Sequence, residues 1–233
     1  MQLSWIYGAA EPPLVSHDGV MMHPAAAKAF AAMQHQAAKA GIKLAVTSGY
    51  RSFERQLAIW NAKATGKRPL LDAKGQPLDG SSLDADKLID TILLWSALPG
   101  CSRHHWGTDL DVFDAARIEK DALKLEAWEY AKDGPCHALA NWLIESGEAF
   151  GFFLPYQAGK SGVSPEPWHI SFAPAAQFAI NQFDTNLLRS VIAASDMALK
   201  DTVLLRLDTL VERYVRHFAA PSFTFDELDL RHE

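Results

Sequence analysis

The spacing of hydrophobic positions predicts the regular elements of the first third of the chain. Residues 23–40 carry apolar side chains at helical spacing after Pro24, and they predict a helix. The apolar run 42–47 (IKLAVT) is rich in β-forming residues and predicts a buried strand. Residues 53–65 predict a second helix with Ser52 as its N-cap.

The pattern changes in the middle of the chain. The polar, Gly- and Pro-rich residues 67–82 predict a long surface loop, and residues 83–98 predict a helix. Apolar and polar residues alternate over 108–114, which predicts a strand. Asp109 and Asp111 then share one face of that strand, so two carboxylates point the same way.

The last part of the chain mixes both kinds of element: a helix over 135–150, strands over 152–156 and 167–172 with a polar loop 157–165 between them, and helical spacing from 174 onward, notably over 201–218. Strands and helices do not alternate regularly, so the pattern favours an α+β fold with a small antiparallel-type sheet flanked by helices. We expect one domain over residues 1–173 and a helical C-terminal extension over 174–233.

Composition narrows the class of protein. With 233 residues, 48% hydrophobic and 21% charged, the chain is able to bury a large core. Its 22 basic and 28 acidic residues give a net charge of −6, the wrong sign for a nucleic-acid-binding protein. No apolar run approaches the roughly 20 residues of a membrane span, so we expect a soluble protein. The N-terminus does not resemble a secretory leader, which leaves a cytoplasmic protein or one whose leader has been removed.

Cysteine and histidine are the residue types with chemical potential. Cys101 and Cys136 are able to form one disulfide or to remain two free thiols. Among the nine histidines, His104 and His105 are adjacent, and His169 follows a tryptophan in a short apolar segment. These three histidines are the candidates for a site.

Two histidines and a carboxylate suit a metal. A catalytic zinc usually takes three protein ligands drawn from His and Asp or Glu and leaves a fourth position for water. His104, Asp111 and His169 fit this pattern, and Gly107 lets the chain turn between the first two. Asp109 shares the strand face with Asp111, so spacing alone does not separate them as ligands.

Glu166 lies three residues before His169, across Pro167, where a general base beside the metal would be. Ordinary interpretations exist for each residue alone. A histidine beside Trp168 is often a buried, hydrogen-bonded side chain, and Asp111 is equally suited to ending a strand.

Three sequence blocks, TSGYRSFERQ at 47–56, SRHHWGTDLD at 102–111 and EPWH at 166–169, resemble a known family. The family is that of the zinc D-alanyl-D-alanine peptidases of the vancomycin-resistance carboxypeptidase and dipeptidase type, whose fold is shared with the signalling domain of hedgehog proteins. Its pattern is Ser-x-His-x-x-Gly-x-Ala-x-Asp, then Glu-x-Trp-His. The chain matches it at Ser102, His104, Gly107, Asp111, Glu166, Trp168 and His169.

The resemblance implies residue roles. It implies one zinc ion held by His104, Asp111 and His169, with Glu166 as catalytic base, and it favours Asp111 over its neighbour as the ligand. Arg51 matches the family arginine that holds the substrate carbonyl or oxyanion, although a surface arginine would also pair with a nearby carboxylate.

Other matches are looser. Gln56 is expected to line the same cleft. Ser102 is expected to contact substrate or to orient the histidine loop, or else to serve only as a turn hydroxyl. Trp168 would pack beside the ligands, and Lys160 of the polar loop would meet a substrate carboxylate. Asp109 replaces the family alanine, where it is placed to orient a histidine or to alter what the pocket accepts.

These implications make the expected protein a D-alanyl-D-alanine carboxypeptidase acting on peptidoglycan peptides. The alternatives are an L,D-carboxypeptidase or an endopeptidase with the same metal site, and a binding module that has lost catalysis. Glu166 and Arg51 argue against the binding module, because a structural zinc needs neither. Whether residues 67–82 close one end of the groove would separate a carboxypeptidase from an endopeptidase.

Overall fold

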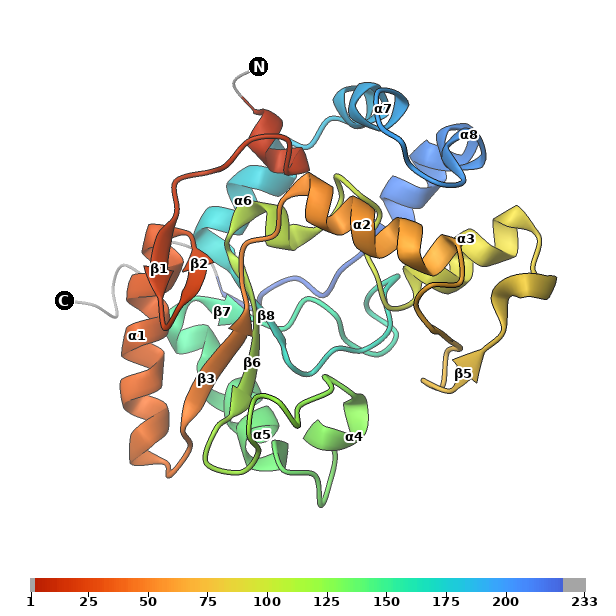
Figure 1. Ribbon diagram of the computed structural model, residues 1–233. Helices are drawn as coiled ribbons and strands as arrows, with labels where there is room; N and C mark the ends of the chain where they lie inside the picture. Colours follow the sequence, from red (N-terminus) through yellow and green to blue (C-terminus); the bar gives the residue numbers. More distant parts are fainter. Residues whose placement is uncertain (1–2, 224–233) are drawn as a thin grey trace.

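A four-stranded antiparallel sheet lies at the centre of the protein, whose computed structural model describes residues 3–223. The strand order is β3-β6-β8-β7, so β6 and β8 are the inner strands (Figure 1). The bounds are β3 Leu44–Ser48, β6 Asp109–Asp114, β7 Phe152–Phe153 and β8 His169–Phe172. Two hairpins stand apart from this sheet: β1 Val15–His17 with β2 Val20–Met22, and β4 Leu70–Leu71 with β5 Pro77–Leu78.

The helices surround the sheet and confirm the α+β class (Figure 1). Side chains from α1 and α5 pack with the sheet in one hydrophobic cluster, while α2, α3 and the C-terminal helices form a second. The bounds are α1 Pro24–Lys39, α2 Phe53–Ala64, α3 Ala85–Leu93, α4 Ala127–Tyr130, α5 His137–Ser146, α6 Ala173–Asn181, α7 Thr185–Ala193 and α8 Lys200–Val211. No helix among the described residues is long and apolar enough to cross a membrane.

Local signals explain where α2 begins. The Ser52 hydroxyl accepts a hydrogen bond from the Arg55 amide at 3.2 Å and caps the first turn, as the sequence predicts. A bulge between Val46 and Ser48 interrupts the pairing of β3 with β6 just before this helix. Bulges re-aim side chains, and this one is followed by Gly49, whose missing Cβ would lie 2.5 Å from the Met21 carbonyl oxygen. The chain therefore enters α2 along a path that the bulge and Gly49 define.

Some predicted elements need correction. Residues 67–82 are not only a surface loop, because they form the β4–β5 hairpin and bury Leu70 in the core. The helix predicted over 83–98 ends at Leu93. Beyond it the Trp95 indole donates to the Asp72 carbonyl at 2.9 Å, a contact across the chain that helical spacing does not report. The strand predicted over 152–156 ends at Phe153, two residues before Pro155.

The C-terminal helices pack on the rest of the chain. The Trp60 indole of α2 donates to the Ala198 carbonyl at 2.9 Å, and the Tyr7 hydroxyl donates to the Asp184 carbonyl at 3.0 Å. The division into residues 1–173 and an extension stays a prediction. Cys101 and Cys136 are both free and buried, and they belong to different hydrophobic clusters.

Candidate metal centre

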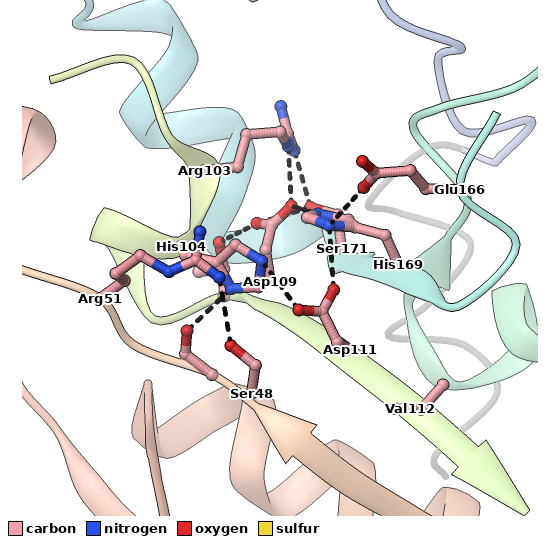
Figure 2. Close-up of polar contacts among 12 residues, drawn as sticks. Ser48, Arg51, Arg103, His104, Asp109, Asp111, Val112, Glu166, His169 and Ser171 are labelled. Atoms are coloured by element: carbon pink, nitrogen blue, oxygen red, sulfur yellow. Dashed lines mark hydrogen bonds and ion pairs between the residues drawn. The ribbon is translucent and has the colours of Figure 1, made fainter. Parts of the chain in front are cut away.

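Three side chains from separate elements converge beside the inner strands (Figure 2). His104 lies in a short 3₁₀ turn, Asp111 on β6 and His169 on β8, where Asp111 and His169 are register partners. One nitrogen or oxygen from each of the three lies within 4.8 Å of the others. All three residues are buried.

The turn that carries His104 ends at Gly107, which has a φ of +70°. Glycine adopts this left-handed conformation without the strain that a side chain would bring. A Cβ there would also lie 2.8 Å from Leu14 and 3.0 Å from the His23 amide nitrogen. The glycine therefore returns the chain from the His104 turn into β6, as the sequence predicts.

Hydrogen bonds determine which nitrogen of His104 is free. Its Nδ1 lies 2.8 Å from the Gly49 carbonyl oxygen, which only accepts, so Nδ1 carries the proton. The unprotonated Nε2 then faces Asp111, 3.4 Å from Oδ2. His104 thus presents a lone pair to the point of convergence.

His169 is oriented in the same way by Asp109. Its Nε2 lies 2.9 Å from Asp109 Oδ1, while Nδ1 lies 3.3 Å from Asp111 Oδ1 and 3.4 Å from Glu166 Oε2. Burial would lower the pKa of His169, but the hydrogen bond to Asp109 and the nearby carboxylates of Asp111 and Glu166 raise it well above its ordinary value. The surroundings of His169 Nδ1, between the carboxylates of Asp111 and Glu166, therefore favour a positive charge.

Asp111 lacks a complete set of partners. Burial would raise the pKa of this carboxyl, but His104 and His169 hold it well below its usual range, so it is ionised. Its Oδ1 is nevertheless buried with no hydrogen-bond partner among the described residues. A buried, ionised oxygen without a donor is costly unless a cation completes it.

Asp109, by contrast, is fully bonded. Its Oδ1 also accepts from Arg103 Nε at 2.8 Å, and its Oδ2 accepts from the hydroxyls of Thr108 at 2.7 Å and Ser171 at 3.0 Å. Arg103 also donates to the Ser171 hydroxyl at 2.7 Å. Burial would raise the pKa of Asp109, but Arg103 and His169 hold it well below the usual range.

Aromatic rings enclose the Arg103 guanidinium. Its central carbon lies 4.8 Å from the ring centroid of Trp106, 4.9 Å from Phe218 and 5.7 Å from Phe153. Phe218 follows the helical turn Glu212–Arg216, so the chain after α8 contributes to the rear of the site.

Glu166 and His169 are held together by a turn. The His169 amide donates to the Glu166 carbonyl at 3.1 Å, which closes a four-residue turn with Pro167 at its second position, where proline is favoured. Glu166 therefore lies beside the convergence point and lines the same cavity as His104, Asp111 and His169.

Arg51, which lies just before the start of α2, also lines that cavity and is positioned by three groups. Its guanidinium donates to Gln56 Oε1 at 2.9 Å. It also lies 3.4 Å from the Ser48 hydroxyl (Figure 2). Its carbonyl accepts from His105 Nδ1 at 2.6 Å. Burial lowers the pKa of His105 to about 3, so this ring is neutral and its Nε2 accepts from the Gly100 amide.

The other predicted site residues divide into two groups. Ser102 and Trp168 line the cavity, and the Trp168 ring also packs on Tyr130 at 5.6 Å between centroids. Gln56 is buried behind Arg51 instead of lining the cavity, and its amide also donates to the Ala97 carbonyl. The structure does not bring Lys160 to the cavity, because it is exposed, with Nζ 3.3 Å from Gln157 Oε1.

Sequence reasoning missed several neighbours of the site. Arg103 is the main omission, and the departure at Asp109 was its signal, because a new buried carboxylate needs a partner. Tyr156 was also missed; its ring lies 4.7 Å from that of His169, and burial raises its pKa to about 12. Lys63, on α2, lines the cavity as well.

The donor set fits a zinc ion. It offers two imidazole nitrogens and one carboxylate, and the imidazoles donate their other N–H groups to a carbonyl and a carboxylate, as metal-binding histidines usually do. The unpartnered Asp111 oxygen is the observation that a cation would explain.

Comparison with known proteins identifies the family of the chain. The profile of the VanY D-alanyl-D-alanine carboxypeptidase family matches residues 19–175. An uncharacterized Haemophilus influenzae protein is 35% identical over 121 residues, which are 51% of this chain and 92% of that protein. The putative carboxypeptidase YodJ of Bacillus subtilis is 28% identical over 152 residues, 63% of this chain and 44% of YodJ.

Solved structures share the fold. VanYB in complex with D-alanine-D-alanine has a TM-score of 0.53 at 20% identity, covering 83% of this chain and 89% of that one. A vancomycin-resistance VanY variant in complex with Zn(II) has a TM-score of 0.52 at 20% identity, covering 83% and 90%. The LdcB LD-carboxypeptidase has a TM-score of 0.52 at 22% identity, covering 89% and 81%. With its family profile matched over residues 19–175, the chain belongs to the VanY family of D-alanyl-D-alanine carboxypeptidases.

Proposed function

We propose that this protein is a zinc-dependent carboxypeptidase that removes the C-terminal D-Ala from peptidoglycan peptides. The observation that carries the proposal is the meeting of two oriented imidazoles with an ionised, incompletely bonded Asp111 beside Glu166. Family membership supports the peptidase class, and one fold neighbour is complexed with Zn(II).

His104 through Nε2, His169 through Nδ1 and the Asp111 carboxylate would hold the metal. When bound, zinc supplies Lewis acidity and brings the pKa of a coordinated water down to about 7. Asp109 and the Gly49 carbonyl keep both imidazoles in the tautomers that this binding requires.

Glu166 is the proposed general base. Its carboxylate lies 3.4 Å from His169 Nδ1 and lines the cavity, so it is placed to take a proton from the attacking water. The water oxygen then forms a bond to the scissile carbonyl carbon. Glu166 returns the proton to the leaving nitrogen as the C–N bond breaks, so the carboxylate is regenerated and D-Ala leaves as a free amino acid.

Arg51 is the proposed partner of the developing oxyanion. Two donors of its guanidinium are directed by Gln56 and Ser48, which limits the movement of the side chain within the cavity. A positioned donor of this kind typically contributes about 10²–10³-fold in rate. The binding-module alternative would leave both Arg51 and Glu166 without a purpose.

The walls of the cavity favour a carboxypeptidase over an endopeptidase. Leu71 of the β4–β5 hairpin and Trp95 both line the cavity, and the Trp95 indole ties this hairpin down through the Asp72 carbonyl. Residues 67–82 therefore contribute a wall at the side of the cavity where α2 ends. A groove limited on one side suits a peptide terminus better than a continuous strand.

Product analysis tests the proposal. The zinc-loaded protein and its Glu166→Ala variant would be incubated with peptides ending in D-Ala-D-Ala and with peptides carrying an L,D-linked D-Ala, and the products identified by mass. We expect D-Ala release from the first peptide, slowed at least about 10²-fold in the variant. Zinc content and melting temperature are the controls. No release from either peptide, or equal activity of the variant, would overturn the proposal; release from the L,D peptide alone would reassign the specificity.

A further inference from the structure

The cavity contains a second basic side chain, Lys63, to which the proposed mechanism gives no role. Arg51 and Lys63 are the lysine and arginine residues that line it within the described part of the chain. Arg51 is held by Gln56 and Ser48. The Lys63 carbonyl accepts from the Gly66 amide at 3.2 Å, but the Lys63 ammonium group makes no hydrogen bond or ion pair with any described residue. A half-buried ammonium group without a partner is unusual, because its three donors lose water on burial.

The fold places Lys63 toward the closed side of the cavity. Lys63 follows Gln56 by seven residues on α2, so both lie on the same helix face about 10 Å apart along the axis. The helix begins next to the metal centre, where the Arg51 amide donates to the His104 carbonyl, and it ends at the β4–β5 hairpin. Lys63 also lines an adjoining hollow whose other wall includes Leu70 and Leu78 of that hairpin.

On the basis of the proposed function, we infer that Lys63 binds a carboxylate of the substrate, and specifically the C-terminal carboxylate of the departing D-Ala residue. A carboxypeptidase must distinguish a chain end from the middle of a chain, and the difference between them is one negative charge. Lys63 is a free cation at the side of the cavity that the hairpin limits. Lys160, which the sequence suggests for this role, is exposed and outside the cavity.

The surroundings of Lys63 agree with an anionic ligand. Burial and the nearby Arg68 lower the pKa of the Lys63 amine, while the charge of Glu166 opposes this change. The ammonium group is therefore poorly solvated in the absence of substrate, and a carboxylate would relieve that cost. Lys63 and Glu166 line the same cavity, which places both side chains around the space where the substrate would bind.

Kinetics on paired substrates test the inference. The zinc-loaded enzyme would be assayed on an acyl-D-Ala-D-Ala peptide as the free acid and as the C-terminal amide, and on the acid peptide with its internal side-chain carboxylate amidated. For Lys63→Met we expect kcat/KM on the free acid to fall about 10- to 100-fold, to the level of the amide, because one charged hydrogen bond is lost. The rate on the amide should stay within about twofold, and Lys63→Arg should retain most of the activity on the acid.

Two controls keep the result interpretable. Lys67→Met removes the same charge from an exposed position on the same side of the molecule and should change neither substrate. Binding of the free-acid peptide to the Glu166→Ala variant, measured by calorimetry with and without Lys63→Met, reports recognition without turnover. The dissociation constant should rise about 10- to 100-fold when Lys63 is replaced.

The contrary outcomes are distinct. An equal loss on acid and amide would show that Lys63 acts on the reaction centre and not on the terminal carboxylate, and would overturn the inference. A penalty that disappears when the internal side-chain carboxylate is amidated would overturn it in favour of a different carboxylate. If the wild type hydrolyses neither peptide, the proposed function fails, and the calorimetric comparison still decides the role of Lys63.

Discussion

Asp109 and Asp111 lie two residues apart on the same face of β6, yet their surroundings differ completely. Both oxygens of Asp109 receive donors from the chain itself: Arg103, Thr108, Ser171 and His169. Among the described residues Asp111 forms ion pairs only with His104 and His169, and its Oδ1 has no hydrogen bond there. Both carboxylates are buried and ionised, so the contrast lies in their partners and not in their exposure.

We therefore assign Asp109 to the structural framework and Asp111 to the proposed metal-binding site. Both oxygens of Asp109 are hydrogen-bonded without any ligand, although Arg103 Nη1 is itself buried with no hydrogen-bond partner among the described residues. The partners of Asp109 come from the His104 turn, from Thr108 directly before β6 and from β8, so Asp109 joins these segments. The Oδ1 atom of Asp111 lacks a hydrogen bond among the described residues. One strand thus presents a carboxylate that orients His169 and another at which we propose that the metal binds.

Replacement of Asp111, the carboxylate with an unpaired oxygen, should have the largest effect on activity. Asp111→Asn takes away the anionic ligand, and we expect loss of stoichiometric zinc and a fall of about 10³-fold or more in kcat, because Lewis acidity contributes several kcal/mol. Metal analysis after gel filtration and the D-Ala release assay measure both. Asp114→Asn, at the far end of the same strand, is the matched control and should retain zinc. Full zinc occupancy in Asp111→Asn would contradict the comparison.

Replacement of Asp109, the carboxylate with both oxygens hydrogen-bonded, should mainly lower the free energy of unfolding. Asp109→Ala leaves the Arg103 guanidinium buried without its carboxylate, and breaking such a pair typically costs about 3–5 kcal/mol of unfolding free energy. It also removes the acceptor for His169 Nε2, which should weaken zinc binding about 10- to 100-fold. Urea unfolding and zinc titration measure the two effects.

The double variant Arg103→Met/Asp109→Ala sharpens this prediction. It removes both charges and restores the alanine of the family pattern, so most of the lost stability should return. Zinc affinity should stay low, because His169 still lacks its acceptor. Recovery of both properties would show that Asp109 acts only through the Arg103 pair and does not position His169.

Arg51 should have the next largest effect. Arg51→Met removes the proposed oxyanion donor, and kcat/KM should fall about 10²–10³-fold while zinc remains bound, since Arg51 touches none of the three proposed ligand side chains. Arg55→Met, on the exposed side of α2, should leave the rate unchanged. Loss of zinc in Arg51→Met would assign Arg51 to the framework instead.

The smallest expected change follows from the support of Arg51. Gln56→Met removes the acceptor that directs the guanidinium and leaves the Ala97 carbonyl without its donor. We expect a fall of about 10-fold in kcat and a loss of about 1–3 kcal/mol in unfolding free energy. An unchanged kcat in a destabilised variant would mean that Gln56 supports the fold and not Arg51.

Local signals made part of the fold predictable from sequence. The Ser52 cap of α2, the Gly107 turn and the alternation in β6 depend on neighbours in the chain, and the structure has all three. The β4–β5 hairpin was missed because two-residue strands are too short to show a period. The end of α3 was misplaced because Trp95 bonds to the distant Asp72 carbonyl.

The candidate site also has one part that the sequence predicted and one part that it did not. The resemblance to the family named the side chains that converge, and the register of β6 with β8 brings Asp111 opposite His169. The partnership of Arg103 with Asp109 required knowledge of how a 3₁₀ turn packs against a strand and against Phe218 near the C-terminus. The sequence alone does not indicate whether Lys63 or Lys160 lies in the cavity. The structure does, because Lys63 lines the cavity and Lys160 does not.

We propose above that one zinc ion binds beside β6 through His104, Asp111 and His169. X-ray absorption spectroscopy of the zinc-loaded protein, with the metal content measured on the same sample, tests it most directly. We predict one zinc per chain with only nitrogen and oxygen ligands at about 2.0–2.2 Å, and loss of the signal in Asp111→Asn. A sulfur ligand at about 2.3 Å would place the metal on a cysteine such as Cys101 in the cavity wall, and would contradict binding by His104, Asp111 and His169.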